Sequence, residues 1–313
     1  MYKIGIIGAG IICKNHVNAI EKIEDVKLQA VADIILGRAV EYAEPYNAKA
    51  YIDYKQMIME EDLDIAIINL PHKLHCEATV LCAEKGIHVL VEKPMAASVK
   101  DCEIMLEAAR NNSVKLMVGH IQHYQPQNIK AKEIILSGEL GKLVSIEDNW
   151  HGNYFSESRP KWFFSNEMAG GGPLMNMGAH MIDRTQWLAG SRIKRIEGKV
   201  GYHKEGYEIE GNFQFFAELE NGINILANYS GYVSVPINEI TLFFTEGIMK
   251  VTRTSITIFR ENKDLLEIEV SKEKDPFFLQ LVDFINSIDN NDIPAISGEY
   301  GLEVVKAAQS IYK

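Results

Sequence analysis

Short apolar runs alternate with amphipathic helical segments through residues 1–119 of the chain. The runs are YKIGIIG, VKLQAVAD, DIAIINL, HVLVE and KLMVG, and segments with a helical spacing of apolar residues separate them. This alternation predicts βαβ units around a parallel sheet. Because a run such as Ile65–Leu70 is almost entirely apolar, we expect helices to cover both faces of that sheet. The first domain is therefore expected to be a doubly wound α/β domain over residues 1–119.

Residues 120–313 follow a different pattern and are expected to form a second domain. Helices are expected over Pro126–Ser137 and from Pro173 to Leu188, with the strand KLVSIEDNW and a long irregular stretch between them. From Ile193 onward, apolar runs separated by turns predict an antiparallel meander, with strands near Arg195–Tyr202, Asn212–Leu219, Asn224–Tyr229, Glu239–Phe244 and Ser255–Phe259.

Helices over Pro276–Ile288 and Tyr300–Lys313 close the chain and can pack back on the first domain. We expect residues 120–313 to form an α/β domain with a large, mostly antiparallel open sheet.

The composition is that of a globular protein with a small-molecule ligand. A chain of 313 residues with 47% hydrophobic residues exceeds what one core usually supports, so two domains are expected. The net charge of −11, without a basic cluster, argues against nucleic acid and anionic membranes as partners. No apolar run approaches the ~20 residues of a membrane span, and the chain begins with a strand, so a cytoplasmic location is expected.

The cysteines and histidines do not predict a metal site. All four cysteines lie in the first third of the chain without a CxxC spacing, so neither a disulfide framework nor a thiolate zinc site is expected. Two histidine pairs, His72 with His75 and His120 with His123, have a three-residue spacing that metal sites use. No cysteine or carboxylate completes a ligand set nearby. The acidic stretches Asp62–Asp64 and Glu205–Glu210 are interpreted as ordinary loop charges.

The stretch GIIGAGIICKNHV joins the first expected strand to the first helix. Gly8 and Gly10 form a GxGxx turn, which lets the backbone approach a pyrophosphate at the helix N-terminus. Cys13 takes the place of the third glycine, where a small side chain still permits close packing. A simple tight connection is the alternative. However, the next strand ends at Asp33, about 20 residues later, where an acid typically binds the adenosine ribose. A dinucleotide site that prefers NAD over NADP is therefore expected.

Further residues lie at the strand ends where a bound dinucleotide is expected. The strand HVLVE ends in the charged residues Glu92 and Lys93, directly before Pro94. A charge at the end of a buried strand needs a partner or a function. The candidate cofactor contacts are therefore Gly8, Gly10, Ile11, Ile12, Asp33, Leu70, Pro71, His75, Glu92 and Lys93.

The stretch AGGGPLMNMGAHMIDRTQWLAG, residues 169–190, opens with three glycines and a proline that predict a helix start. One face of this helix carries Asn176, His180, Asp183 and Trp187. A solvated face is the alternative interpretation. Yet the face has one carboxylate and no lysine, whereas histidine and asparagine typically bind protons and hydroxyls. We therefore interpret it as one wall of a site.

Three motifs, in this order along the chain, resemble those of the Gfo/Idh/MocA family, named for glucose–fructose oxidoreductase and inositol dehydrogenase. They are the GxGxx turn at Gly8, Glu92-Lys93-Pro94, and GGGxLxNxGxHxxD from Gly170 to Asp183. The resemblance covers nearly the whole chain. It implies a Rossmann domain followed by a domain with a large open sheet. It also implies NAD(P)-dependent oxidation or reduction of a sugar or cyclitol hydroxyl, and assembly as a homodimer or homotetramer through that sheet.

The same resemblance implies the catalytic residues. Lys93 would contact the reacting hydroxyl, His180 would exchange its proton, and both would face one substrate oxygen. Asn176 is the third candidate; many polyol dehydrogenases of the family have an aspartate there. An amide cannot relay a proton as a carboxylate does, so Asn176 is expected to hydrogen-bond the substrate. His123 stands where relatives often have arginine, so the substrate of any one relative is not transferable to this chain.

Substrate contacts are expected from Asn176, from His123 and Asp183, and from an aromatic loop region whose rings suit the C–H faces of sugars. The residues of that region are Trp150, His151, Tyr154, Arg159 and Trp162. The alternative is that these aromatic residues are packing anchors. Two other functions stay open: a glycosidase that uses tightly held NAD for transient oxidation, and a dinucleotide-sensing regulator without activity. Because Lys93 and His180 are both present, an enzyme is favoured.

Overall fold

The computed structural model describes residues 1–262, 264–270 and 275–312. The chain divides into two compact units. The first comprises Met1–His120 and Asp275–Val305, and the second comprises Ile121–Lys274 and Lys306–Lys313. Of the helix expected over Tyr300–Lys313, the last residue lies outside the described residues.

The first unit contains a six-stranded parallel sheet in the order β3-β2-β1-β4-β5-β6, which confirms the doubly wound α/β prediction. Its strands are β1 (Tyr2–Ile7), β2 (Val26–Ala32), β3 (Lys49–Tyr51), β4 (Ile65–Ile68), β5 (His88–Glu92) and β6 (Leu116–Gly119). The edge strand β3 was not expected from the sequence, because three residues are too few to display an alternating pattern.

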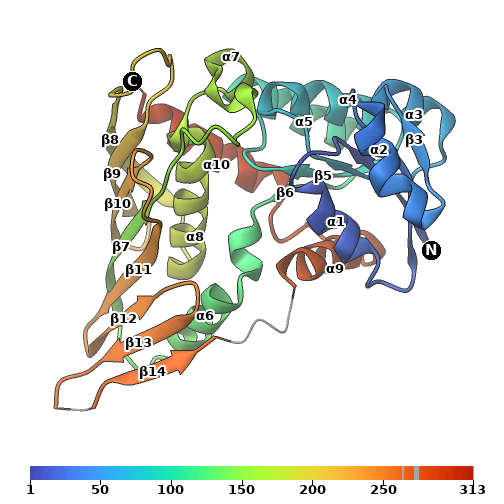
Figure 1. Cartoon of the computed structure of the whole chain (residues 1–313). Helices are drawn as coiled ribbons and strands as arrows, with labels where there is room; N and C mark the ends of the chain where they lie inside the picture. Colours follow the sequence, from blue (N-terminus) through green and yellow to red (C-terminus); the bar gives the residue numbers. More distant parts are fainter. Residues whose placement is uncertain (263, 271–274, 313) are drawn as a thin grey trace. The chain divides into compact units, whose positions relative to one another are not determined.

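Helices cover both faces of this sheet, with α4 and α5 on one face and α1 and α9 on the other (Figure 1). The helices of this unit are α1 (Cys13–Ile20), α2 (Leu36–Ala43), α3 (Tyr54–Glu60), α4 (His75–Glu84), α5 (Val99–Asn111) and α9 (Pro276–Asp289), together with the start of α10 (Gly298–Ser310). The residues of β4 are fully buried, as expected for a strand covered on both sides. Two short 3₁₀ turns lie in the loops of this unit, at Glu44–Tyr46 before β3 and at His72–Leu74 after β4.

The second unit contains an eight-stranded sheet in the order β14-β13-β12-β11-β7-β10-β9-β8. Its strands are β7 (Leu143–His151), β8 (Ile193–Gly201), β9 (Asn212–Leu219), β10 (Asn224–Ser230), β11 (Ile237–Phe244), β12 (Gly247–Val251), β13 (Ser255–Phe259) and β14 (Leu266–Glu269). The sheet is mostly antiparallel, as predicted, but it is not a simple meander. Strand β7 lies between β10 and β11 and pairs with β10 in parallel. Strands β12 and β14 were not expected from the sequence.

Helices α6 (Pro126–Ser137) and α8 (Ala179–Ala189) lie along one face of this sheet (Figure 1). The short helix α7 (Asn166–Ala169) and 3₁₀ turns at Ile121–Tyr124 and Lys161–Phe164 belong to the connecting segments. The single helix expected from Pro173 to Leu188 instead begins with a π-helical turn over Leu174–Gly178 and continues as α8. Within the described ranges, no helix is both long and apolar enough to cross a membrane.

Candidate functional site

The two glycines of the turn after β1 have different structural roles. Gly8 has a φ of +98°, and a Cβ built on it would lie 2.7 Å from the Asn69 carbonyl oxygen. The protein's own packing therefore requires glycine at Gly8. A Cβ on Gly10 would meet no atom within 4 Å among the described residues. The open space beside Gly10 is what a phosphate that approaches the backbone closely would need.

Helix α1 begins directly after this turn. In the described part of the chain, its start has no hydrogen bond from a capping side chain and no acidic residue in the first turn. Ile11 is exposed, Ile12 is half-buried, and Cys13 is fully buried against the sheet, as expected for the small residue at the third glycine position. A helix N-terminus without a competing carboxylate suits an anionic group. The turn therefore fits the pyrophosphate of a dinucleotide.

Asp33 lies just beyond the end of β2, with its carboxylate held in place by the glycine turn. Oδ2 accepts a hydrogen bond from the Ala9 amide at 2.9 Å, and Oδ1 accepts one from the Ile35 amide at 2.8 Å. A carboxylate has about four acceptor positions, so two remain for other donors. Asp33 therefore fits a pair of ribose hydroxyls.

His75 is placed differently from the sequence prediction. Its side chain is fully buried, with Nε2 2.8 Å from the Leu70 carbonyl oxygen and Nδ1 3.2 Å from those of Pro94 and Met95. Burial lowers the pKa of His75, although these carbonyl contacts work in the opposite direction. The ring thus joins the loop after β4 to the loop after β5 and offers no surface to a cofactor. Leu70 and Pro71, in the same loop, are half-buried.

The charged pair at the end of β5 has a partner that the sequence did not indicate. His16 of α1 is buried, and its Nε2 lies 3.0 Å from Glu92 Oε1, while Glu92 Oε2 accepts the Lys93 amide at 3.2 Å. Burial raises the pKa of Glu92, but the His16 hydrogen bond and the Lys93 charge outweigh it and hold this pKa below its usual range. Glu92 therefore faces into the protein. A single histidine in a helix gives no pattern by which it could have been found.

In the second unit, the predicted polar face of the helix is not solvated. Asn176 is 5% exposed and Asp183 is fully buried, which excludes the interpretation as a surface face. His180 is half-buried, and its ring stacks on that of Trp150 with centroids 5.8 Å apart. The Arg184 guanidinium lies over the same indole at 4.8 Å. The structure thus brings Trp150 and His180 together, as expected for two residues of one site.

Trp150 is supported by a buried ion pair. Arg184 donates hydrogen bonds from two nitrogens to the Asp148 carboxylate and from a third to Asn238 Oδ1 at 2.7 Å. Burial raises the pKa of Asp148, and the Arg184 charge works against that rise. Asp148 belongs to the strand of Trp150, and Arg184 to the helix of His180, so this pair fixes the helix against the sheet.

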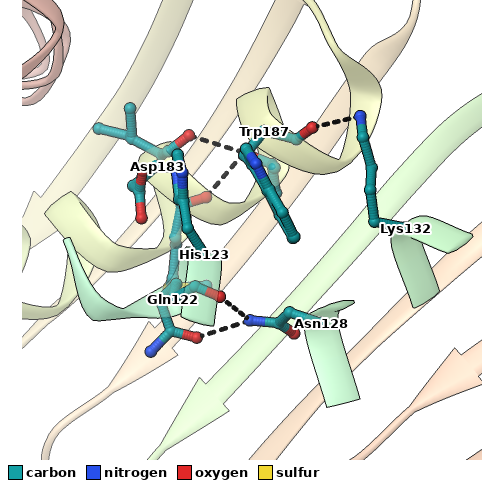
Figure 2. Close-up of polar contacts among 9 residues, drawn as sticks. Gln122, His123, Asn128, Lys132, Asp183 and Trp187 are labelled. Atoms are coloured by element: carbon teal, nitrogen blue, oxygen red, sulfur yellow. Dashed lines mark hydrogen bonds and ion pairs between the residues drawn. The ribbon is translucent and has the colours of Figure 1, made fainter. Parts of the chain in front are cut away.

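The other predicted residues of this helix form a second contact group. His123 Nε2 lies 2.7 Å from Asp183 Oδ1, and the His123 ring stacks on Trp187 with centroids 4.9 Å apart. Figure 2 shows His123 between Asp183 and Trp187. Lys132 donates hydrogen bonds to the Trp187 and Leu188 carbonyl oxygens at 2.7 and 3.0 Å, near the end of α8, and burial lowers the pKa of this lysine. The helix end is thereby stabilised.

The aromatic loop region is mainly a packing cluster, contrary to the prediction for Tyr154. Tyr154 is fully buried, and the Arg159 guanidinium lies 4.1 Å from the centroid of the Tyr154 ring. Arg159 Nε also donates a hydrogen bond to the Tyr154 carbonyl oxygen at 2.7 Å. Trp162 is half-buried and stacks on Phe163 at 3.7 Å. His151 Nδ1 accepts the Ser230 amide at 3.0 Å, within the sheet. Tyr154 therefore has no exposed surface, whereas Arg159 and His151 have internal partners and are half-buried.

The structure does not offer a metal site in the residues that it describes. Within them, no three histidine, cysteine, aspartate or glutamate side chains are grouped so that they could hold a metal ion. The four cysteines are free, and burial raises the pKa values of the Cys13, Cys82 and Cys102 thiols to about 12.

Both units match models of known protein families. Residues 2–120 match an oxidoreductase family with an NAD-binding Rossmann fold, and residues 128–250 match the Gfo/Idh/MocA C-terminal domain. An inositol 2-dehydrogenase of Salmonella typhimurium is 28% identical over 62% of this chain, and the match spans only 56% of that enzyme's length. A myo-inositol 2-dehydrogenase of Thermotoga maritima is 24% identical, and the match covers 96% of this chain and 92% of the relative.

The fold of this chain is also similar to the folds of solved structures. A levoglucosan dehydrogenase in complex with NADH and levoglucosan superimposes with a TM-score of 0.90 at 18% identity, covering 99% of this chain and 96% of the other. At this identity the likeness concerns the fold. The two family matches together cover most of the chain, and they agree with the parallel sheet of the first unit and the mixed sheet of the second. The protein thus belongs to the Gfo/Idh/MocA family of oxidoreductases, and its first unit is an NAD(P)-binding Rossmann domain.

Proposed function

We propose that the protein is a dehydrogenase or reductase that uses NAD and acts on a secondary hydroxyl or carbonyl of a sugar, a sugar derivative or a cyclitol. The observation that carries the proposal lies within the first unit. The open turn at Gly10, the oriented carboxylate of Asp33 and the Lys93 ammonium all follow the carboxyl ends of parallel strands of one sheet. Ligands of doubly wound sheets bind at that edge.

The cofactor side of the proposal rests on this chain's own groups. The amides at the start of α1 would bind the pyrophosphate, and Gly10 would allow its close approach. Asp33 would accept hydrogen bonds from both ribose hydroxyls and repel a 2′-phosphate, which favours NAD over NADP. Leu70 and Pro71 would line the dinucleotide, while His75 and Glu92 would position their loops from inside the protein. When bound, the nicotinamide accepts or returns a hydride.

The reacting groups on the protein would be Lys93 and His180. In the oxidation direction, the substrate C–H bond breaks with loss of hydride, and the hydroxyl proton passes to the His180 imidazole. The Lys93 ammonium stabilises the negative charge that develops on the oxygen. Asn176, whose amide cannot take up a proton, would hydrogen-bond a neighbouring hydroxyl. Trp150, stacked on His180, would offer a ring face to the substrate's C–H surface, and Trp162 would contribute a second aromatic surface.

The substrate class is inferred from similar proteins, which are two inositol 2-dehydrogenases and a levoglucosan dehydrogenase. The test is absorbance at the nicotinamide wavelength with NAD⁺ and a panel of inositols, aldoses and sugar nucleotides. We expect one compound to reduce the cofactor with saturation kinetics. Cleavage of a glycosidic bond without net change of cofactor absorbance would indicate the redox-assisted glycosidase instead. Dinucleotide binding without turnover of any compound would favour the regulator.

We also propose that the protein assembles as a homodimer or homotetramer through the sheet of the second unit. Phe216 of β9 lies opposite Leu226 of β10, and both are about half exposed, at 52% and 51%. By strand alternation, they occupy the face opposite the buried Phe215 and Ala227. Paired exposed apolar side chains on a sheet suit a self-association surface. Light scattering should give a multiple of the chain mass, and Leu226→Glu should reduce it.

A further inference from the structure

The start of the helix that carries Asn176 and His180 is held by a carboxylate from a distant part of the chain. Helix N-termini leave several amides without intrahelical partners. Here Glu210 accepts the Gly172 amide at 2.9 Å through Oε2 and the Leu174 amide at 2.8 Å through Oε1. Pro173, between them, has no N–H. Glu210 thus binds both available amides at this point of the chain.

Glu210 is itself fixed by Tyr312, near the carboxyl end of the chain. The Tyr312 hydroxyl donates to Glu210 Oε1 at 2.7 Å, and Glu210 is only 1% exposed. Burial, followed by the charge of Glu210, raises the pKa of Tyr312, so its hydroxyl keeps its proton and remains a donor. The interpretation of residues 205–210 as ordinary loop charges is therefore wrong for Glu210.

The glycines of the GGG motif are explained by this contact. Gly171 has a φ of +147°, and a Cβ there would collide with the Tyr312 hydroxyl. A Cβ at Gly172 would lie 2.5 Å from the Glu210 carbonyl oxygen. These two positions need glycine because Glu210 and Tyr312 pack directly against the backbone. The glycines of this motif therefore make room for Glu210 and Tyr312 at the start of the helix.

Asn176 lies two residues after Leu174, the second residue whose backbone amide Glu210 binds. The backbone N–H of Asn176 donates a hydrogen bond to the Gly172 carbonyl oxygen at 3.2 Å. The π-helical turn over Leu174–Gly178 then leads into α8, which carries His180. π-Helical turns are frequent at functional sites and lack the regular hydrogen bonding of an α-helix. An unusual turn of this kind needs an external anchor to keep one geometry, and the buried carboxylate supplies it.

We propose that Glu210 and Tyr312 form a clamp of positioning residues, which fixes Asn176 and His180 for the reaction without touching the substrate. The proposal rests on the function proposed above for Asn176 and His180.

Tyr312→Phe removes one hydroxyl and keeps the ring. Tyr2→Phe is the matched control, because the Tyr2 hydroxyl also donates to a carboxylate, that of Asp289 at 2.6 Å, in the first unit. Glu210→Gln is the second variant, since an amide cannot accept both N–H groups through its two terminal atoms.

Two measurements test the clamp. Hydrogen exchange followed by mass spectrometry should show about tenfold faster exchange in peptides that cover residues 172–180 in Tyr312→Phe and Glu210→Gln, and no change there in Tyr2→Phe. With a compound that the wild type oxidises, kcat should fall about tenfold in Tyr312→Phe, while the dissociation constant for NAD⁺ stays within about twofold.

Unchanged exchange in residues 172–180, or unchanged kcat despite faster exchange, would overturn the clamp. A loss of NAD⁺ affinity equal to the loss of kcat would do the same, since it would indicate general loosening of the fold. If the wild type turns over no compound of the panel, the proposed function fails. The exchange experiment then decides the clamp by itself, because it needs neither substrate nor cofactor.

Discussion

His16 Nε2 lies 3.0 Å from Glu92 Oε1, so the helix that follows the glycine turn is tied to the strand end that carries Lys93. His16 is buried, and its ring also packs edge-on against Phe277 of α9 with centroids 5.0 Å apart. A charged residue at the end of a buried strand is therefore explained by an internal partner. Within the first unit, Glu92 thus connects helix α1, which follows the proposed pyrophosphate-binding turn, to the proposed catalytic residue Lys93.

Glu92→Gln should destabilise the protein in a pH-dependent manner. The pKa of Glu92 is lower in the folded protein than in the unfolded chain. The ionised Glu92 therefore stabilises the fold fully at a pH above its pKa in the unfolded chain, and this stabilisation is lost as the pH falls through its pKa in the folded protein. At pH 7 we expect a loss of about 1–3 kcal/mol in the free energy of unfolding, measured by circular dichroism in urea. The loss should shrink below about pH 4.

Glu77→Gln is the control for that experiment. The pKa of Glu77 is also lowered by hydrogen bonds to Lys55 and Tyr54, but its side chain is 57% exposed. Exposed ion pairs contribute little, so the loss should stay below about 1 kcal/mol at every pH. A Glu92→Gln loss that does not vary with pH would show that the charge of Glu92 is not what stabilises this contact.

Alanine at Gly8 and at Gly10 should separate packing from cofactor binding. Gly8→Ala forces a side chain into a positive-φ residue and against the Asn69 carbonyl oxygen, so its melting temperature should fall by several degrees or more. Gly10→Ala adds its Cβ to open space, so its melting temperature should stay within about 2 °C of wild type.

Binding distinguishes the two glycines further. NAD⁺ should bind Gly10→Ala at least about tenfold more weakly by calorimetry, and Gly10→Val should abolish binding while the fold survives. A Gly10→Val protein that binds NAD⁺ with wild-type affinity would show that the dinucleotide lies elsewhere.

Asp33 should determine the preference for NAD⁺ over NADP⁺. Asp33→Asn removes the charge that repels a 2′-phosphate, so NADP⁺ should bind more tightly and NAD⁺ about tenfold more weakly than in wild type. Arg38 is exposed on α2, five residues after Asp33. Arg38→Ala tests whether this arginine pairs with the 2′-phosphate of NADP⁺. We expect no change of either affinity in that variant. Wild-type protein that binds NADP⁺ as tightly as NAD⁺ would contradict this role of Asp33.

The parallel sheet and its glycine turn could be predicted because their signals are local. Buried strands such as β4 are continuous apolar runs, and the spacing from Gly8 to Asp33 follows from one βαβ unit. The π-helical turn at Leu174–Gly178 could not be predicted, since a single wider turn has no residue pattern of its own. Because such a turn shifts the residues that follow it around the helix axis, the α-helical spacing assumed for Asn176 and His180 was only approximate.

The remote partners of the site could not be predicted, because their contacts join distant parts of the chain. Nothing near Glu210 indicates that it binds Gly172 and Leu174, and nothing near His16 indicates Glu92. Tyr154 was misinterpreted because an aromatic residue in an irregular segment has the same sequence signal whether it packs inside or lines a surface. In each case, tertiary contacts outweigh local patterns.

The most direct test of the account is the kinetics of Lys93→Met, His180→Ala and the double variant with a substrate from the panel. Lys93→Met keeps most of the side-chain stem and removes the charge. It should lower kcat by about 10²–10⁴ while the dissociation constant for NAD⁺ stays within about threefold of wild type. His180→Ala should act alike, and the double variant should be little slower than the slower single variant, because groups that act together on one oxygen are not additive. Turnover retained in Lys93→Met, or a double variant whose loss is the product of the two single losses, would contradict the account.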